Sequence, residues 1–120
     1  MPSCYIVAVM IHVPGPAEGL AWYEKAFPSA TRHRLDGQEF EYLQVGDTRL
    51  EIVQADEKVS SGPRGTVVYW NVANLSESLL ALQNIGARLY RGPMTIENGQ
   101  SMCQVQDPWG NCLGLRGATA

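Results

Sequence analysis

The sequence predicts an α+β fold made of two tandem modules, each with the order strand, helix and three strands. Three observations predict it. Short runs of alternating apolar and polar residues are typical of strands, two apolar stripes at helical spacing interrupt them, and the whole order occurs twice. With 120 residues the chain has the size of one domain, so we expect a single domain over 1–120, with modules at about 4–54 and 66–117 and a linker at about 55–65.

The first module begins with a β-rich run from Tyr5 to Val13, which Pro14 ends. A helix is predicted from Pro16 onward, because proline is tolerated in the first helical turn. Its apolar stripe consists of Leu20, Tyr23 and Phe27, and it stops at Pro28. Gly-containing turns then separate three predicted strands: Thr31 to Leu35, Glu39 to Val45, and Thr48 to Gln54.

The second module repeats this order from a predicted strand at Thr66 to Val72. Asn74 followed by Glu77 forms a helix start of the capping-box type, and Gly86 stands where a helix-ending residue with positive φ belongs. Three further strands are predicted: one near Arg88 to Tyr90, one at Ser101 to Gln106, and one at Cys112 to Leu115. The turn Asp107-Pro108-Trp109-Gly110-Asn111 precedes the last strand.

The two modules can be superposed residue by residue. Val13 falls on Val72 and Leu20 on Leu79 with one constant offset of 59 residues. The run Leu50-Glu51-Ile52 falls on Leu113-Gly114-Leu115 with an offset of 63. We interpret this match as an internal repeat.

Strand alternation sorts the side chains of the first, fourth, fifth and eighth strands onto two faces. The face expected to pack under the helices is apolar and contains Val7, Val9, Ile11, Val13, Leu50, Ile52, Val68, Trp70, Val72, Leu113 and Leu115. The opposite, mixed face contains Ala8, Met10, His12, Arg49, Glu51, Val53, Val67, Tyr69, Asn71, Cys112, Gly114 and Arg116. A mixed face suits a small-molecule cleft, although a solvated or dimer-facing surface has the same pattern.

The composition excludes several partners. A net charge of −3 and a pI near 5.3 give no electrostatic reason to expect nucleic acid or an anionic membrane. The apolar run at 5–13 is too short to span a bilayer and lacks a signal-peptide layout. Three cysteines without metal-type spacing indicate reduced thiols, so we expect a cytoplasmic protein.

The element order, the segment Val13-Pro14-Gly15-Pro16-Ala17-Glu18-Gly19-Leu20-Ala21-Trp22-Tyr23 and the closing turn 107–111 resemble the vicinal oxygen chelate superfamily. That superfamily includes glyoxalase I, bleomycin-resistance proteins, fosfomycin-resistance enzymes and extradiol dioxygenases. The resemblance implies a curved mixed sheet around a cleft, with the helices on the outer face, and a homodimer. It also implies that the ligand is held in the concave cleft.

In metal-dependent members, four strand positions hold a divalent ion, and the resemblance carries them onto Ala8, Glu51, Val67 and Gly114. Only Glu51 has a side chain that can ligate a metal. His12 lies about 13 Å along the strand from Ala8, too far to replace it. We therefore expect no metal and no cofactor.

The predicted function is metal-independent binding of a small apolar or aromatic molecule. The candidate ligand-binding residues are Ala8, Met10, His12, Arg49, Glu51, Val67, Tyr69, Cys112 and Gly114. Glu51 has two interpretations, an ion pair with Arg49 or a ligand-binding group in the cleft. One alternative function is a lyase or isomerase with Glu51 as general base and Tyr69 or Arg49 orienting the substrate. The other is a non-catalytic, dimeric interaction module.

Overall fold

The structure, a computed structural model, describes residues 6–34 and 40–119. The chain divides between Ser60 and Ser61 into two compact units, a first unit of residues 1–60 and a second unit of residues 61–120. The two units have the same element order, and each contains one four-stranded sheet and one α-helix.

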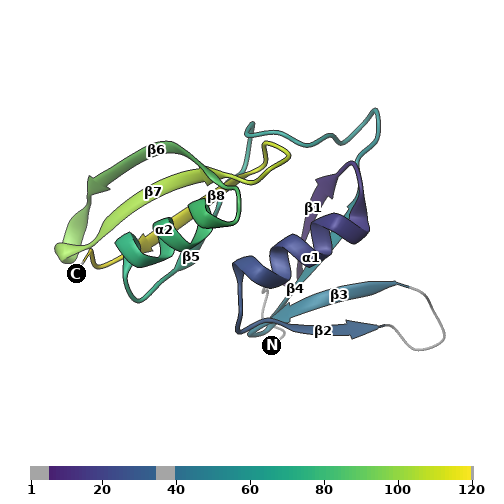
Figure 1. The fold of residues 1–120 in the computed structure, drawn as a ribbon, viewed down its shortest axis with the longest axis horizontal. Coiled ribbons are helices and arrows are strands. Elements are labelled where there is room, and N and C mark those ends of the chain that lie inside the picture. The colour runs from purple at the N-terminus through teal and green to yellow at the C-terminus, as the bar shows by residue number, and fades with distance from the viewer. Residues whose placement is uncertain (1–5, 35–39, 120) are drawn as a thin grey trace, which may run out of the picture. The chain divides into compact units, whose positions relative to one another are not determined.

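The elements of the first unit are β1 (Ala8–Val13), α1 (Pro16–Ala26), β2 (Thr31–Arg34), β3 (Glu41–Val45) and β4 (Thr48–Gln54). Its strands are ordered β1-β4-β3-β2, with β1 parallel to β4 and the other neighbours antiparallel. Helix α1 lies along one face of this sheet and contacts β1, β3 and β4 (Figure 1).

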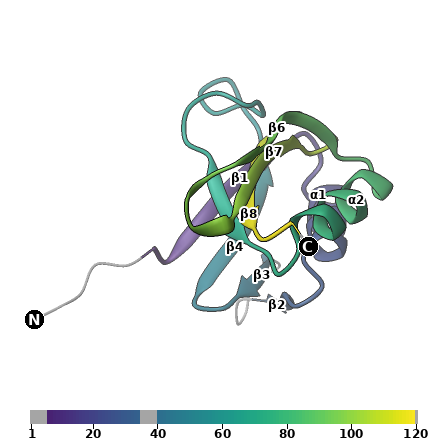
Figure 2. The same ribbon diagram turned by 90° about the vertical axis from the view of Figure 1, so that its left-hand side faces the viewer.

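The elements of the second unit are β5 (Val68–Asn71), α2 (Leu75–Asn84), β6 (Arg88–Thr95), a 3₁₀ turn η1 (Glu97–Gly99), β7 (Ser101–Gln106) and β8 (Cys112–Gly117). The order β5-β8-β7-β6, with β5 parallel to β8, repeats that of the first unit. Helix α2 lies beside this sheet (Figure 2) and contacts β6, β7 and β8. The predicted βαβββ order is therefore confirmed in both units.

The strand registers agree with the predicted repeat. In the first unit Val9 pairs with Leu50, and in the second unit Val68 pairs with Leu113. These pairs keep the offsets of 59 and 63. The buried apolar side chains of the first unit are Val13, Leu20, Trp22, Tyr23, Leu43, Leu50 and Ile52. Those of the second unit are Leu75, Leu82, Ala87, Met102, Cys103, Val105, Leu113 and Leu115.

Two side chains differ from their predicted positions. Val7, predicted to lie in the core, is 62% exposed because it precedes β1, an edge strand with only one neighbour in its sheet. Val67, predicted within the fifth strand, precedes β5, which begins at Val68. Tyr5, Leu35 and Glu39, predicted strand ends, lie outside the described residues.

Strand β6 is longer than predicted, because it continues past Tyr90 to Thr95. Gly92 and Pro93 normally interrupt strands. Here the pairing with β7 shifts register on both sides of Arg91, and Gly92 has a φ of 82°. With these irregularities in the pairing, β6 continues through Gly92 and Pro93.

The structure contains the residues predicted to begin and end helix α2. The backbone N–H of Glu77 donates to the Asn74 side chain at 3.0 Å, which is the predicted N-cap of α2. Gly86 has the expected positive φ, 106°. In α1, a Cβ on Gly19 would lie 2.8 Å from methyl carbons of Val13 and Ile52, so glycine permits the close approach of the helix to the sheet.

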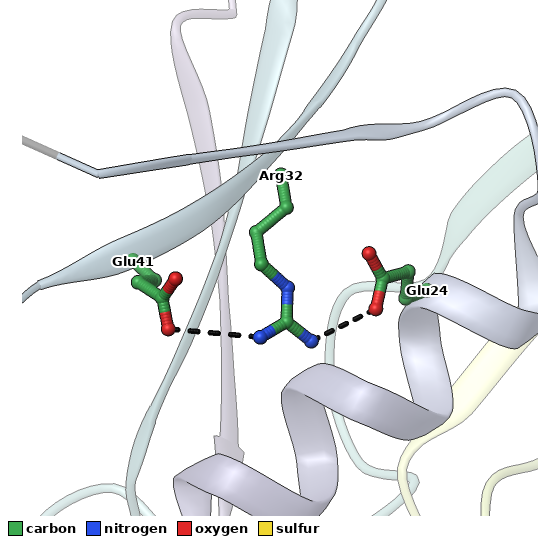
Figure 3. Close-up of polar contacts among 3 residues, drawn as sticks. All are labelled: Glu24, Arg32 and Glu41. Carbon is green, nitrogen blue, oxygen red and sulfur yellow. Dashed lines mark hydrogen bonds and ion pairs between the residues drawn. The ribbon is translucent and has the colours of Figure 1, made fainter.

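Arg32 links α1 to the strands of the first unit (Figure 3). Its guanidinium lies 2.8 Å from the Glu24 carboxylate of α1 and 3.6 Å from the Glu41 carboxylate of β3. All three side chains are about a third exposed or more, so each ion pair contributes only about 0–1 kcal/mol.

Candidate functional site

Tyr69 and Gly114 lie opposite each other on the mixed face of the second unit. They are register partners in the parallel β5–β8 pair. A Cβ added to Gly114 would lie 2.5–2.6 Å from three carbons of the Tyr69 ring. The ring therefore occupies the space that any side chain at position 114 would need.

Gln104 connects Tyr69 to Cys112. Its side-chain amide donates to the Tyr69 hydroxyl at 2.8 Å, and its carbonyl oxygen accepts from the Cys112 thiol at 3.5 Å. The Arg116 guanidinium lies 5.1 Å from the centre of the Tyr69 ring, within cation–π range. Gln104 is a functional candidate that the sequence interpretation missed, although alternation in β7 and its pairing with Gly114 put it on this face.

Cys112 does not have the environment of a reactive thiol. Burial raises the pKa of Cys112, and the Asp107 carboxylate acts in the same direction, whereas the positive charge of Arg91 lowers it by less than burial raises it. A thiol with a raised pKa contains less thiolate at neutral pH. Cys112 therefore fits a packing and hydrogen-bonding role.

Arg49 is the central cation on the mixed face of the first unit. Its guanidinium lies 3.3 Å from the Glu51 carboxylate and 4.3 Å from the centre of the Tyr42 ring. The Glu51 side chain is 15% exposed. The structure thus shows the predicted Arg49–Glu51 ion pair and adds a stacked tyrosine to it.

Tyr42 belongs to a row of rings on the same face. His33 stacks on one side of it with centroids 5.7 Å apart, and Phe40 lies 6.4 Å away. Leu43, the next residue of β3, is fully buried, which places Tyr42 on the opposite, mixed face. Sequence alternation alone does not fix the orientation of this strand.

The remaining predicted residues follow the strand registers. Met10 and not Ala8 is the register partner of Glu51, while Ala8 pairs with Arg49 and His12 with Val53. Met10 is 54% exposed. The predicted residues thus form two groups: Ala8, Met10, His12, Arg49 and Glu51 on the first unit, and Tyr69, Cys112 and Gly114 on the second.

The donor set at the four expected metal positions does not fit a divalent ion. Glu51 is the sole donor among them and is engaged by Arg49, while the Tyr69 ring covers Gly114. Within residues 6–34 and 40–119, no cluster of three or more His, Cys, Asp or Glu side chains is arranged to hold a metal. A divalent ion needs several such donors at short range.

Neither described helix is long and apolar enough to cross a membrane. The helices have 11 and 10 residues.

Comparison with known proteins agrees with the observed fold. A family model described as the Glyoxalase/Bleomycin resistance protein/Dioxygenase superfamily matches residues 5–115. A search of curated proteins found no match.

Many solved structures are similar to this chain at low sequence identity. A glyoxalase/bleomycin resistance protein/dioxygenase family enzyme from Burkholderia phytofirmans PsJN has a TM-score of 0.74 and 15% identity, over 92% of this chain and 95% of that one. A glyoxalase-related enzyme from Fulvimarina pelagi has a TM-score of 0.75 and 15% identity, over 94% and 87%.

A superfamily member from Sphaerobacter thermophilus DSM 20745 has a TM-score of 0.72 and 18% identity, over 96% of this chain and 98% of that one. At these identities the likeness concerns the fold. The family model matches nearly the whole sequence, and the chain therefore belongs to the glyoxalase/bleomycin resistance protein/dioxygenase superfamily.

Proposed function

We propose that the chain is a metal-independent binding protein for a small, largely apolar or aromatic molecule. The observation that carries the proposal is the Tyr69 ring over Gly114, at a position where the superfamily resemblance implies a metal ligand. An aromatic ring there supplies a stacking surface in place of a metal donor. The ligand contacts the mixed face of a sheet, as the resemblance to bleomycin-resistance proteins implies.

The side chains on these faces support the proposal. Each face has a tyrosine ring with a guanidinium above it, Tyr42 with Arg49 and Tyr69 with Arg116. Ligand sites commonly combine apolar and aromatic walls with a few polar groups that fix orientation. Met10 and Gln104 add one apolar and one amide group to their respective faces.

The proposal is tested by binding of a planar probe, 2-naphthamide, to protein dialysed against EDTA. We expect saturable shifts of backbone amide signals on β5, β7 and β8 in a ¹⁵N–¹H NMR titration. Tyr69→Leu should weaken binding, whereas Tyr90→Leu, which alters an exposed residue of β6, is the matched control. Elemental analysis showing about one tightly bound divalent ion per subunit would overturn the metal-independent function.

A second candidate function is a lyase or isomerase that uses Glu51 as general base. It is favoured by the position of Glu51, a largely buried carboxylate on the mixed face with Arg49 at 3.3 Å and Tyr42 beyond it. In this reaction Arg49 would orient a carbonyl or carboxylate of the substrate. Glu51→Gln should abolish turnover of any substrate found, and unchanged turnover would exclude the mechanism.

We also propose a homodimer, which the superfamily resemblance implies. Large exposed apolar side chains, Met10 and Leu80 among them, are available to an interface. Sedimentation equilibrium gives the subunit number directly. If dimerisation protects Met10 from oxidation and no small molecule binds, the non-catalytic interaction module is the better description.

A further inference from the structure

We infer that the mixed face of the second unit binds a small aromatic anion, with Arg91 and Arg116 contacting its carboxylate and Tyr69 contacting its ring. The inference deepens the proposed function and depends on it in one respect, that the chain binds small aromatic molecules. It adds the charge of the ligand and the residues that select it.

Two arginines frame the Tyr69–Gln104 pair. Arg91 of β6 is the register partner of Gln104, and Gln104 is in turn the register partner of Gly114. Arg91 therefore lies two strands, or about 10 Å, from the Gly114 backbone. Arg116 lies two residues along β8 from Gly114, about 7 Å away, with its guanidinium over the Tyr69 ring.

The charge of Arg91 also acts on a neighbour of this pair. Its positive charge lowers the pKa of Cys112, whose thiol donates to Gln104. Charge effects of this kind are appreciable only at short range in water. Arg91 and Arg116 can thus reach a common ligand above Gln104.

Among the described residues, none of the side chains that strand register places on this face has a carboxylate; the Asp107 carboxylate, which also acts on Cys112, is fully buried in the turn before β8. The side chains placed on it by strand register are Tyr69, Asn71, Arg88, Arg91, Met94, Met102, Gln104, Gln106, Cys112, Gly114 and Arg116. The three arginines form no ion pair within the part of the chain that the structure describes. In a protein with a net charge of −3, this is a local concentration of positive charge that attracts anions.

The corresponding face of the first unit differs in charge. There Glu51 takes the position that Gly114 takes in the second unit, and its carboxylate pairs with Arg49 at 3.3 Å. In the second unit Arg116 has the same kind of tyrosine contact without a carboxylate partner among the described residues. The selectivity for an anion is therefore expected on the second unit.

The neighbouring groups favour an aryl carboxylate. A guanidinium binds a carboxylate through two parallel hydrogen bonds, and two guanidinium groups can share its two oxygens. Tyr69 is held in place by Gln104 at one end and by Gly114 below the ring, so a ligand ring would contact Tyr69 on the side where the Arg116 guanidinium lies. A molecule of one or two fused rings has the size of the backbone separations given above, about 7 Å from Gly114 to Arg116 and about 10 Å from Gly114 to Arg91.

The experiment compares 2-naphthoate with 2-naphthamide, which has the same shape without the charge. Both are titrated into the full chain and followed by ¹⁵N–¹H NMR. We expect naphthoate to bind about tenfold more tightly than naphthamide. Arg91→Gln and Arg116→Gln should each weaken naphthoate binding about fivefold or more and leave naphthamide binding within about twofold.

Arg64→Gln is the control variant, because it removes the same charge from an exposed position of the second unit outside the strands. It should leave both affinities unchanged. Arg91→Lys and Arg116→Lys, which keep the charge, should give intermediate affinities for naphthoate. If a glutamine variant does not fold, the lysine variant at the same position takes its place in the comparison.

Each other outcome overturns the inference in a recognisable way. Equal affinity for both probes, with no effect of the arginine substitutions, shows small-molecule binding without anion selectivity; the proposed function then stands and the inference is wrong. An equal loss of naphthoate binding in Arg64→Gln shows general charge attraction and also overturns it. Binding of neither probe contradicts the inference and the proposed function together.

Discussion

The Tyr69 ring lies over Gly114, so close that a Cβ at position 114 would be 2.5 Å from the ring carbon Cδ2. This contact bears both on the packing of β8 and on the proposed ligand surface. It explains why glycine occurs in the middle of a buried strand, where it is otherwise unfavourable. It also sets the orientation of the aromatic ring at the centre of the proposed ligand surface.

The first prediction concerns this contact. Gly114→Ala should lower the free energy of unfolding by about 1–3 kcal/mol, because the added methyl group overlaps the ring. Urea denaturation measures the loss. In a Tyr69→Ala background the same substitution should cost much less, since the overlap is gone. Equal costs in both backgrounds would show that the ring does not occupy this space.

The second prediction concerns Asp107, which is fully buried in the β7–β8 turn. Its carboxylate accepts from the backbone N–H groups of Trp109 and Asn111 at 2.9 Å and from the Asn111 side-chain amide at 3.0 Å. Asp107→Ala leaves these donors without that acceptor and should cost about 1–3 kcal/mol of stability. Thermal and urea unfolding check the value.

Two further variants distinguish the loss of the hydrogen bonds in the buried turn from the loss of a negative charge. Asp107→Asn keeps one acceptor oxygen and should cost less than the alanine substitution. Asp56→Ala removes an acid from an exposed turn where water can replace its hydrogen bonds, so it should have little effect. A larger loss from Asp56→Ala than from Asp107→Ala would contradict the assigned role of the buried turn.

The third prediction is a pH dependence in the loop that follows β4. Hydrogen bonds from the backbone N–H groups of Val59 and Lys58 lower the pKa of Asp56, with a smaller contribution from the positive charge of His12. Because the pKa is lower in the folded chain, the stabilisation of the turn is complete above the unfolded pKa and is lost as the pH falls through the folded value.

An NMR titration from pH 6 downward tests this prediction. The amide signals of Lys58 and Val59 should move together with the Asp56 carboxyl carbon, at a pH below the ordinary aspartate range. Asp56→Asn keeps the acceptor oxygen but does not titrate, so these amide shifts should then disappear. Amide shifts that persist in Asp56→Asn would assign the transition to another group.

The fourth prediction concerns Cys112. Burial raises the pKa of its thiol, so in a Cys4→Ser, Cys103→Ser background it should react with iodoacetamide more slowly than free cysteine at pH 8. Arg91→Gln removes the nearby charge that lowers this pKa and should slow the reaction further. Mass spectrometry follows both rates, and a faster reaction in Arg91→Gln would contradict the proximity of Arg91 and Cys112.

The sequence by itself determined the element order, most of the core-facing residues and the lack of a ligating side chain at position 114. These features depend on local chemistry. Alternation assigns Leu50 and Leu113 to the core, Asn74 begins a helix through its own side chain, and glycine at position 114 cannot ligate anything whatever surrounds it.

The tertiary structure decided which side chains meet on each sheet face. Gln104 and Arg91 belong to separate strands, and only the register of β6, β7 and β8 puts them in one row with Gly114, the partner of Tyr69. The two irregularities that set this register lie on either side of Arg91, one at Tyr90 and one at Gly92-Pro93, where local propensity predicts that a strand ends. Register depends on pairing between distant segments, so the arginines of the proposed anion site could be identified only once the strands were seen together.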